Sequence, residues 1–106
     1  MTLIFSTGAA ADQDEAAEWY EQESQILAQR FQTHLETTLQ RIAESPRIFP
    51  FIDKKRQKAL LQVFPYAVIF ERRENSIWIL AVAHAKRRPG YWRKRTPPHP
   101  PASDVL

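Results

Sequence analysis

The chain has 106 residues, of which 43% are hydrophobic and 25% charged, with no cysteine and a formal net charge of +3. This length and composition predict a single soluble globular domain and exclude disulfides and thiolate metal sites. No apolar run approaches the roughly 20 residues that span a bilayer, and no leader-like segment precedes a cleavage site. We therefore expect a cytoplasmic protein that uses no membrane, metal ion or other cofactor.

The charge is unevenly distributed along the chain. Residues 1–53 hold nine acidic and three basic side chains, a net charge of −6, whereas residues 54–106 hold twelve basic and three acidic ones, a net charge of +9. This asymmetry predicts that the C-terminal half binds an acidic partner.

The N-terminal half is predicted to form a strand followed by two helices. Thr2–Ser6 is rich in strand formers. Ala9–Glu44 has helical periodicity, but its apolar stripe is interrupted near Ser24, a residue type that favours helix N-termini. We therefore predict a helical hairpin that ends at Ser45-Pro46, because the residue before a proline is pushed out of the helical region.

The first of these helices shows two features. Ala16, Trp19 and Tyr20 fall at helical spacing on one face, so both aromatic side chains are expected to pack on the sheet. The acidic side chains of Asp12, Asp14 and Glu15 are expected in the early turns, where they favour the positive end of the helix dipole.

Three strands are predicted in the C-terminal half. They cover Gln57–Phe64, Tyr66–Arg72 and Ile77–Ala83, after a loop over Arg47–Lys55 and with a turn at Arg73–Ser76. The last strand is apolar on both faces, which is typical of a central strand. The predicted order is strand, helix, helix and a three-stranded antiparallel meander, an α+β fold with both helices on one face of the sheet. Residues 1–95 form the domain, and residues 96–106 are predicted to be a flexible, proline-rich tail.

A basic segment, residues 86–95, follows the last strand. It carries six lysines and arginines with no acid among them, and Tyr91 and Trp92 lie between the cations. Cations interleaved with aromatic rings are suited to a polyanion or an acidic protein segment. For Trp92 we favour packing over binding.

Several of these residues together resemble the RelE/ParE toxins of bacterial toxin–antitoxin modules. The resemblance covers about residues 3–95 and rests on strand order, the basic segment and short matches: Arg56, FPY at 64–66, AVAH at 81–84, Arg88-Pro89 and Tyr91-Trp92. It implies a small basic plasmid-stabilisation toxin that a cognate acidic antitoxin neutralises. Members of this family either cut messenger RNA on the ribosome or poison DNA gyrase.

The resemblance gives conflicting indications about RNA cleavage. In the ribonuclease members an arginine follows the tyrosine that begins the third strand, whereas here Ala67 follows Tyr66. Those members also carry lysines along the second strand; Lys58 matches one, but Leu60 stands at the next inward position. Both departures favour the gyrase poisons. An alternative set of catalytic side chains for RNA cleavage is Arg56, His84, Arg87 and Tyr91.

Three hypotheses follow. The first is a ParE-like toxin that binds and inhibits a macromolecule such as gyrase, and the second is a RelE-like messenger RNA endoribonuclease. The third is an inactive or repurposed member that only binds its partner, or a plain nucleic-acid-binding module. For target or antitoxin binding, the candidates are Lys58, Lys86, Arg87, Arg88, Tyr91, Arg93, Lys94 and Arg95. The alternative interpretation of His84 is a hydrogen-bonded structural residue at a strand end.

Overall fold

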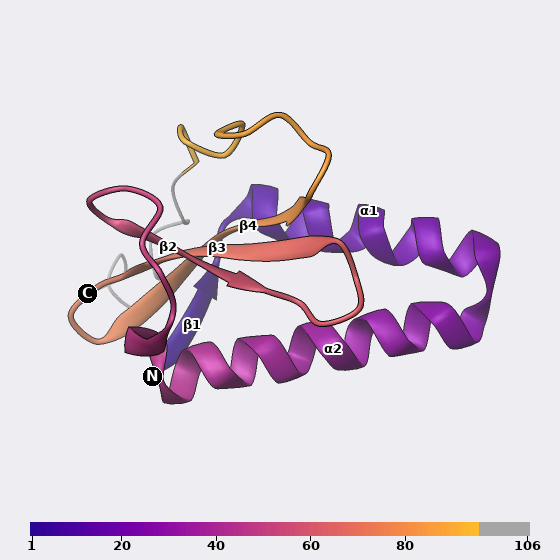
Figure 1. Cartoon of the computed structure of the whole chain (residues 1–106), viewed down its shortest axis with the longest axis horizontal. Coiled ribbons are helices and arrows are strands. Elements are labelled where there is room, and N and C mark those ends of the chain that lie inside the picture. The colour runs from indigo at the N-terminus through magenta and orange to yellow at the C-terminus, as the bar shows by residue number, and fades with distance from the viewer. Residues whose placement is uncertain (96–106) are drawn as a thin grey trace, which may run out of the picture.

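A four-stranded sheet covered by two helices forms the domain (Figure 1). The computed structural model describes residues 1–95, and the predicted tail, residues 96–106, lies outside them. The elements are β1 (Thr2–Phe5), α1 (Thr7–Glu23), α2 (Gln25–Glu44), a 3-10 helix (Pro46–Ile48), β2 (Arg56–Leu60), β3 (Tyr66–Arg72) and β4 (Ser76–His84). This order confirms the predicted α+β fold.

The strands lie in the order β1-β4-β3-β2. The last three form the predicted antiparallel meander, whereas β1 pairs with β4 in parallel and makes the sheet mixed. β4 is therefore a central strand, as its two apolar faces predicted. The strand β2, predicted to reach Phe64, ends at Leu60 because Val63 has a positive φ of 73° and Pro65 lacks a backbone donor.

Two serines set the helix ends. The Ser6 hydroxyl accepts a hydrogen bond from the backbone N–H of Ala9, so α1 begins at Thr7, two residues before its predicted start. The Ser24 backbone N–H donates to the last turn of α1, and its hydroxyl accepts from the N–H of Leu27 in α2. Ser24 thus ends one helix and begins the next, which confirms the predicted hairpin.

The main core lies between the helical hairpin and one face of the sheet. Phe31, Leu35 and Ile42 of α2 are fully buried there against β3 and β4. Tyr20 joins them, with its ring centroid 5.2 Å from that of Phe31. The prediction for Trp19 was wrong: its side chain is 62% exposed. The buried positions of α1 run from residue 9 through 12 and 16, and Trp19 lies to one side of that stripe.

The opposite face of the sheet carries a smaller apolar cluster. Ala67 and Ile69 of β3 lie beside Leu80 and Ala81 of β4, and Trp92 of the basic segment covers them. The pairing of β3 with β4 shifts between Ile69 and Phe70, which is the irregularity of a β-bulge near Leu80. Within residues 1–95, no helix is long and apolar enough to cross a membrane.

Candidate binding surface

The basic segment leaves β4 and passes over the sheet on the face away from the helices (Figure 1). Trp92 anchors it there, with only 5% of its surface exposed. The guanidinium groups of Arg56 and Arg93 lie 5.4 and 5.2 Å from the Trp92 ring, within the range of a cation–π interaction. The structure therefore confirms that Trp92 packs, and the cations are held around it.

Short-range backbone hydrogen bonds shape the basic segment into successive turns. The N–H groups of residues 87, 91, 93 and 95 each donate to the carbonyl three residues earlier. Gly90 has a positive φ of 79°, which a glycine adopts without steric cost. The first turn also uses His84, whose Nδ1 accepts from the N–H of Lys86 at 2.9 Å.

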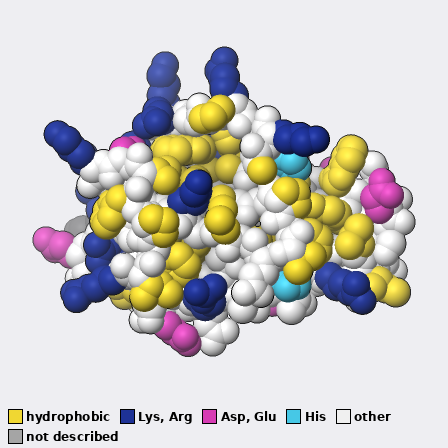
Figure 2. Space-filling view, viewed as in Figure 1, with side chains coloured by type: hydrophobic (Ala, Val, Ile, Leu, Met, Phe, Trp, Pro, Cys, Tyr) yellow, Lys and Arg dark blue, Asp and Glu magenta, His cyan; other side chains and the backbone are white. Residues whose placement is uncertain are grey.

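A groove of about 540 Å³ lies between the sheet and the basic segment. Its apolar lining includes Leu60, Leu61, Phe64, Ala67, Ile69 and Trp92, and its basic lining consists of Lys58, His84, Arg87, Arg88 and Arg93. Leu60 of this lining and the nearby Val63 are strongly exposed for apolar side chains. Figure 2 shows hydrophobic side chains gathered on this side of the molecule with lysines and arginines around them. An apolar floor with a cationic rim fits an acidic, amphipathic partner.

Two aspartates hold much of the basic segment. Asp12 of α1 makes an ion pair with Arg95 at 2.6 Å, a longer one with Arg87 at 3.7 Å, and accepts a hydrogen bond from the Tyr91 hydroxyl at 3.0 Å. The Tyr91 ring lies between the two guanidinium groups, 3.9 Å from Arg87 and 4.8 Å from Arg95. Burial, followed by the charge of Asp12, raises the pKa of Tyr91 to about 12, so its hydroxyl stays protonated.

Asp53, in the loop before β2, is the second aspartate that holds the basic segment. Its carboxylate pairs with Arg56 at 3.0 Å and with Arg93 at 3.4 Å. The backbone N–H of Lys55 and then that of Arg56 donate to it, and these bonds with the Arg56 guanidinium lower the pKa of Asp53 to about 2. Arg56 also donates to the backbone carbonyl of Arg93, which ties the start of β2 to the basic segment.

The four candidates for RNA cleavage are not gathered at one point. His84 and Arg87 line the groove, whereas Arg56 and Tyr91 are not among the groove residues. Arg56 is held by Asp53, and the Tyr91 hydroxyl donates to Asp12. His84 is itself hydrogen-bonded and packs edge-on against Tyr66, with ring centroids 4.9 Å apart.

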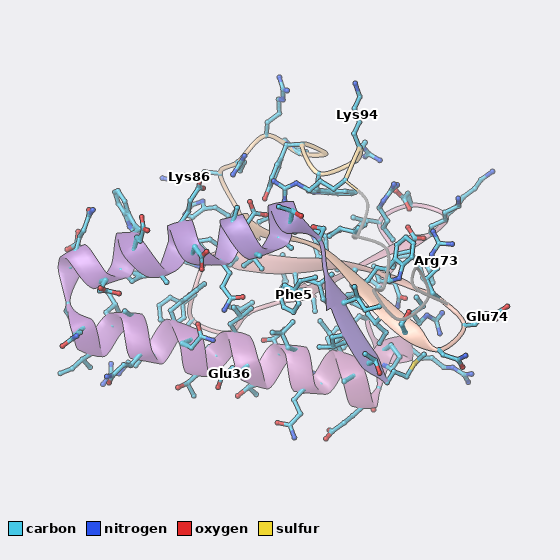
Figure 3. The ribbon with its side chains drawn as sticks, turned by 180° about the vertical axis from the view of Figure 1, so that it is seen from behind. Phe5, Glu36, Arg73, Glu74, Lys86 and Lys94 are labelled. Carbon is cyan, nitrogen blue, oxygen red and sulfur yellow. The ribbon has the colours of Figure 1, made fainter. Side chains whose placement is uncertain are left out.

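The binding candidates fall into two groups. Arg87, Arg93 and Arg95 form ion pairs with acids of the domain, and Tyr91 bonds to Asp12. No ion pair within residues 1–95 involves the other four, which are Lys58, Lys86, Arg88 and Lys94. Figure 3 shows Lys86 and Lys94 pointing away from the domain. Four of the seven cationic candidates thus have no ion pair within residues 1–95, and Arg87 and Arg93 line the groove while paired.

Sequence reasoning missed the two aspartates. Asp12 was expected in the early turns of a helix for its effect on the dipole, but it lies with Ala9 and Ala16 on the buried face of α1. No local signal separates it from its acidic neighbours, since its partner Arg95 is 83 residues away. Asp53 carries a visible signal, the short spacing to Arg56, although Arg93 lies 40 residues further on. No group of three or more acidic or histidine side chains within residues 1–95 is arranged to hold a metal ion.

Comparisons with known proteins identify the family and the fold. The model of the family described as the ParE toxin of the type II toxin–antitoxin system parDE matches residues 3–89. The chain therefore belongs to the ParE toxin family, which confirms the resemblance to RelE/ParE toxins. A solved structure described as the chromosomal ParDE TA system from P. aeruginosa has a TM-score of 0.71 and 18% identity, over 81% of this chain and 97% of that one. This likeness shows the shared fold. No curated protein is significantly similar in sequence.

Proposed function

We propose that this chain is the toxin of a type II toxin–antitoxin module and arrests growth by binding a macromolecular target such as DNA gyrase in the cytoplasm. The observation that carries the proposal is the groove, which combines an apolar floor with a cationic rim. Membership of the ParE family supplies the class of activity. The engagement of Arg56 by Asp53 and of the Tyr91 hydroxyl by Asp12 favours inhibition by binding over RNA cleavage.

We further propose that a cognate acidic antitoxin neutralises the chain by covering this groove. The exposed apolar side chains Leu60 and Val63 offer anchors, and Lys58 and Arg88 offer charge complementarity. The affinity is expected to fall as salt rises, because exposed charges are screened, while the buried apolar contacts retain part of it. Binding that is strong and indifferent to both salt and these two cations would contradict this assignment.

The test begins with induction of the chain in a bacterial host while growth and new messenger RNA 5′ ends are followed. We expect growth arrest without new cuts inside translated codons, and inhibition of supercoiling by gyrase in the presence of the purified chain. The double variant Lys58→Ala/Arg88→Ala should relieve the arrest. The matched control is Arg30→Ala/Arg47→Ala, which removes two exposed cations outside the groove. Equal toxicity of both double variants would overturn the proposed surface, and no arrest by the native chain would overturn the toxin assignment.

A RelE-like endoribonuclease is the second candidate, because His84 and Arg87 line the same groove. In that case induction should produce cuts within translated messages. The variants His84→Gln and Arg87→Ala should then slow cleavage by about tenfold or more, the scale of a general acid–base contribution. Cuts that persist unchanged in both variants would remove these side chains from the mechanism.

A further inference from the structure

Asp12 is a buried carboxylate in the interior of α1 whose partners come from distant parts of the chain. It is 5% exposed. Its Oδ2 accepts from the backbone N–H of Val82 at 3.1 Å and from the Tyr91 hydroxyl at 3.0 Å. Both terminal nitrogens of Arg95 donate to it, at 2.6 and 3.2 Å, and Arg87 lies at 3.7 Å. Hydrogen bonds to a carboxylate are stronger than neutral ones, so these donors hold Asp12 in place and Asp12 in turn holds the side chains that donate to it.

Part of this arrangement completes the edge of the sheet. β1 pairs only with the first half of β4, and the last backbone bond between the two regions comes from the N–H of Ser6. Beyond it, side chains bond to the edge of β4: the Ser6 hydroxyl and Arg95 donate to the Leu80 carbonyl, and Asp12 accepts from the Val82 N–H. Buried backbone groups need hydrogen-bond partners. Arg95 of the basic segment therefore supplies a donor that a neighbouring strand would otherwise provide.

Gly8, in the first turn of α1, makes room for Arg95. A Cβ atom built on Gly8 would overlap the Nε of the Arg95 side chain, with the Cζ only 2.6 Å away. Alanine is favoured over glycine in a helix by about 1 kcal/mol, so glycine costs stability at this position. The close approach of a guanidinium group to the helix backbone is the structural reason for a glycine here.

The same carboxylate determines how the basic segment is presented. Arg87 and Arg95 lie on the two sides of the Tyr91 ring and both reach Asp12. Arg88, between them in sequence, carries no ion pair within residues 1–95 and lines the groove. Arg95 is thus held inward by Asp12, Arg87 is held by it at the rim of the groove, and the adjacent Arg88 is left without an internal partner within residues 1–95.

We propose that Asp12 is a positioning residue for the binding surface: from inside the domain it holds the basic segment against α1 and β4 and thereby places Arg88 at the groove. This inference rests on the proposed function, because it assigns a residue on which target or antitoxin binding depends although it does not reach the surface.

The principal test compares Asp12→Asn with Asp14→Asn, an exposed neighbour on the same helix whose replacement removes the same charge. We expect Asp12→Asn to raise amide hydrogen exchange of residues 86–95 at least tenfold, to leave exchange in α2 and β2 unchanged, and to relieve growth arrest. Asp14→Asn should change none of these.

Two further measurements accompany the principal test, in which unchanged exchange in α2 and β2 shows that the variant is folded. Asp12→Asn should lower the pKa of Tyr91 from about 12, measured by tyrosinate absorbance. Burial raises this pKa first, and the charge and hydrogen bond of Asp12, which the variant removes or weakens, raise it further. Gly8→Ala keeps every charge and favours the helix, but its methyl group displaces the flexible end of Arg95. It should therefore increase exchange in residues 86–95 and weaken the arrest, to a smaller extent than Asp12→Asn.

The outcomes separate this inference from the proposed function. If Lys58→Ala/Arg88→Ala relieves the arrest while folded Asp12→Asn and Gly8→Ala remain fully toxic, the positioning role is wrong and the toxin surface stands. If all of these variants remain fully toxic, the proposed surface itself is wrong. Raised exchange in residues 86–95 together with lost toxicity in both Asp12→Asn and Gly8→Ala supports the inference.

Discussion

The two faces of the sheet are covered in different ways. The helical face is closed by a contiguous set of fully buried side chains, among them Phe31, Leu35 and Phe70. The other face is covered by a ten-residue segment with one large buried side chain, Trp92, and with ion pairs to two aspartates. The first arrangement depends on apolar burial, the second on charge and geometry. A binding surface can therefore be altered here without loss of the core beneath it.

The largest expected effect breaks the helical face. Phe31→Ala removes a fully buried ring that contacts Tyr20, Phe64 and Tyr66, with centroids 5.1 to 5.5 Å apart. We expect a loss of about 3–5 kcal/mol in the free energy of unfolding, measured by urea denaturation. Trp19→Ala, which truncates an exposed ring on α1, is the control and should change stability by no more than about 0.5 kcal/mol. Equal effects of the two would refute this account of the core.

A smaller loss is expected on the opposite face. Trp92→Ala should cost about 3 kcal/mol, the low end for a buried aromatic, because residues 86–95 can detach while the helical core persists. Hydrogen exchange should rise in the basic segment and far less in α2. Trp78→Ala, at a half-buried position on the same face, should have a weaker effect. A uniform rise in exchange across the domain would show that the two faces are not separable.

The hydrogen bonds of Asp53, first from the backbone N–H of Lys55 and then from Arg56, give the second face a pH dependence. The pKa of Asp53 is lowered from 3.8 to about 2 in the folded chain, so its stabilising contribution is complete above 3.8 and is lost as the pH falls through 2. Asp53→Asn should therefore be less stable than the native chain at pH 6, and the difference should shrink toward pH 2. Urea denaturation at the two pH values measures it. A difference that stays constant between them would rule out the ionised carboxylate of Asp53 as its cause.

The smallest expected effect concerns the turn at Gly90. Its φ of 79° disfavours other residues, and an added Cβ would lie 2.6 Å from the Nε of Arg93. Gly90→Ala should cost about 1 kcal/mol and act within the basic segment. Gly8→Ala provides a contrast, since that glycine lies in a helix without a positive φ. The midpoint of urea denaturation measures the effect. If Gly90→Ala is as stable as the native chain, the turn geometry is contradicted.

The element order was predictable from the sequence because its signals are local. Helical periodicity, the capping tendency of Ser24 and the two apolar faces of β4 each arise from neighbouring residues. The parallel pairing of β1 with β4 has no such signal, since it joins residues more than 70 positions apart. The end of β2 at Leu60 depends on the positive φ of Val63, a conformation that a β-branched residue disfavours.

The candidate surface was predictable in part for the same reason. The cluster of cations in residues 86–95 is visible in the sequence, and so is the packing tendency of Trp92. The division of those cations between internal ion pairs and the groove is not, because Asp12 and Asp53 meet Arg95 and Arg93 only once the chain has folded. The prediction for Trp19 failed for the opposite reason: its local spacing suggested burial, but the side chain lies just outside the buried stripe of α1.

The parallel pairing of β1 with β4 also has a consequence for synthesis on the ribosome. The first strand emerges early, but its partner, residues 76–79, emerges more than 70 residues later. The helical hairpin can form beforehand from local contacts, whereas the sheet must wait for long-range ones. The ion pair of Asp12 forms later still, because Arg95 is 83 residues further along the chain. A nascent chain therefore carries an incomplete fold until residue 95 has left the exit tunnel.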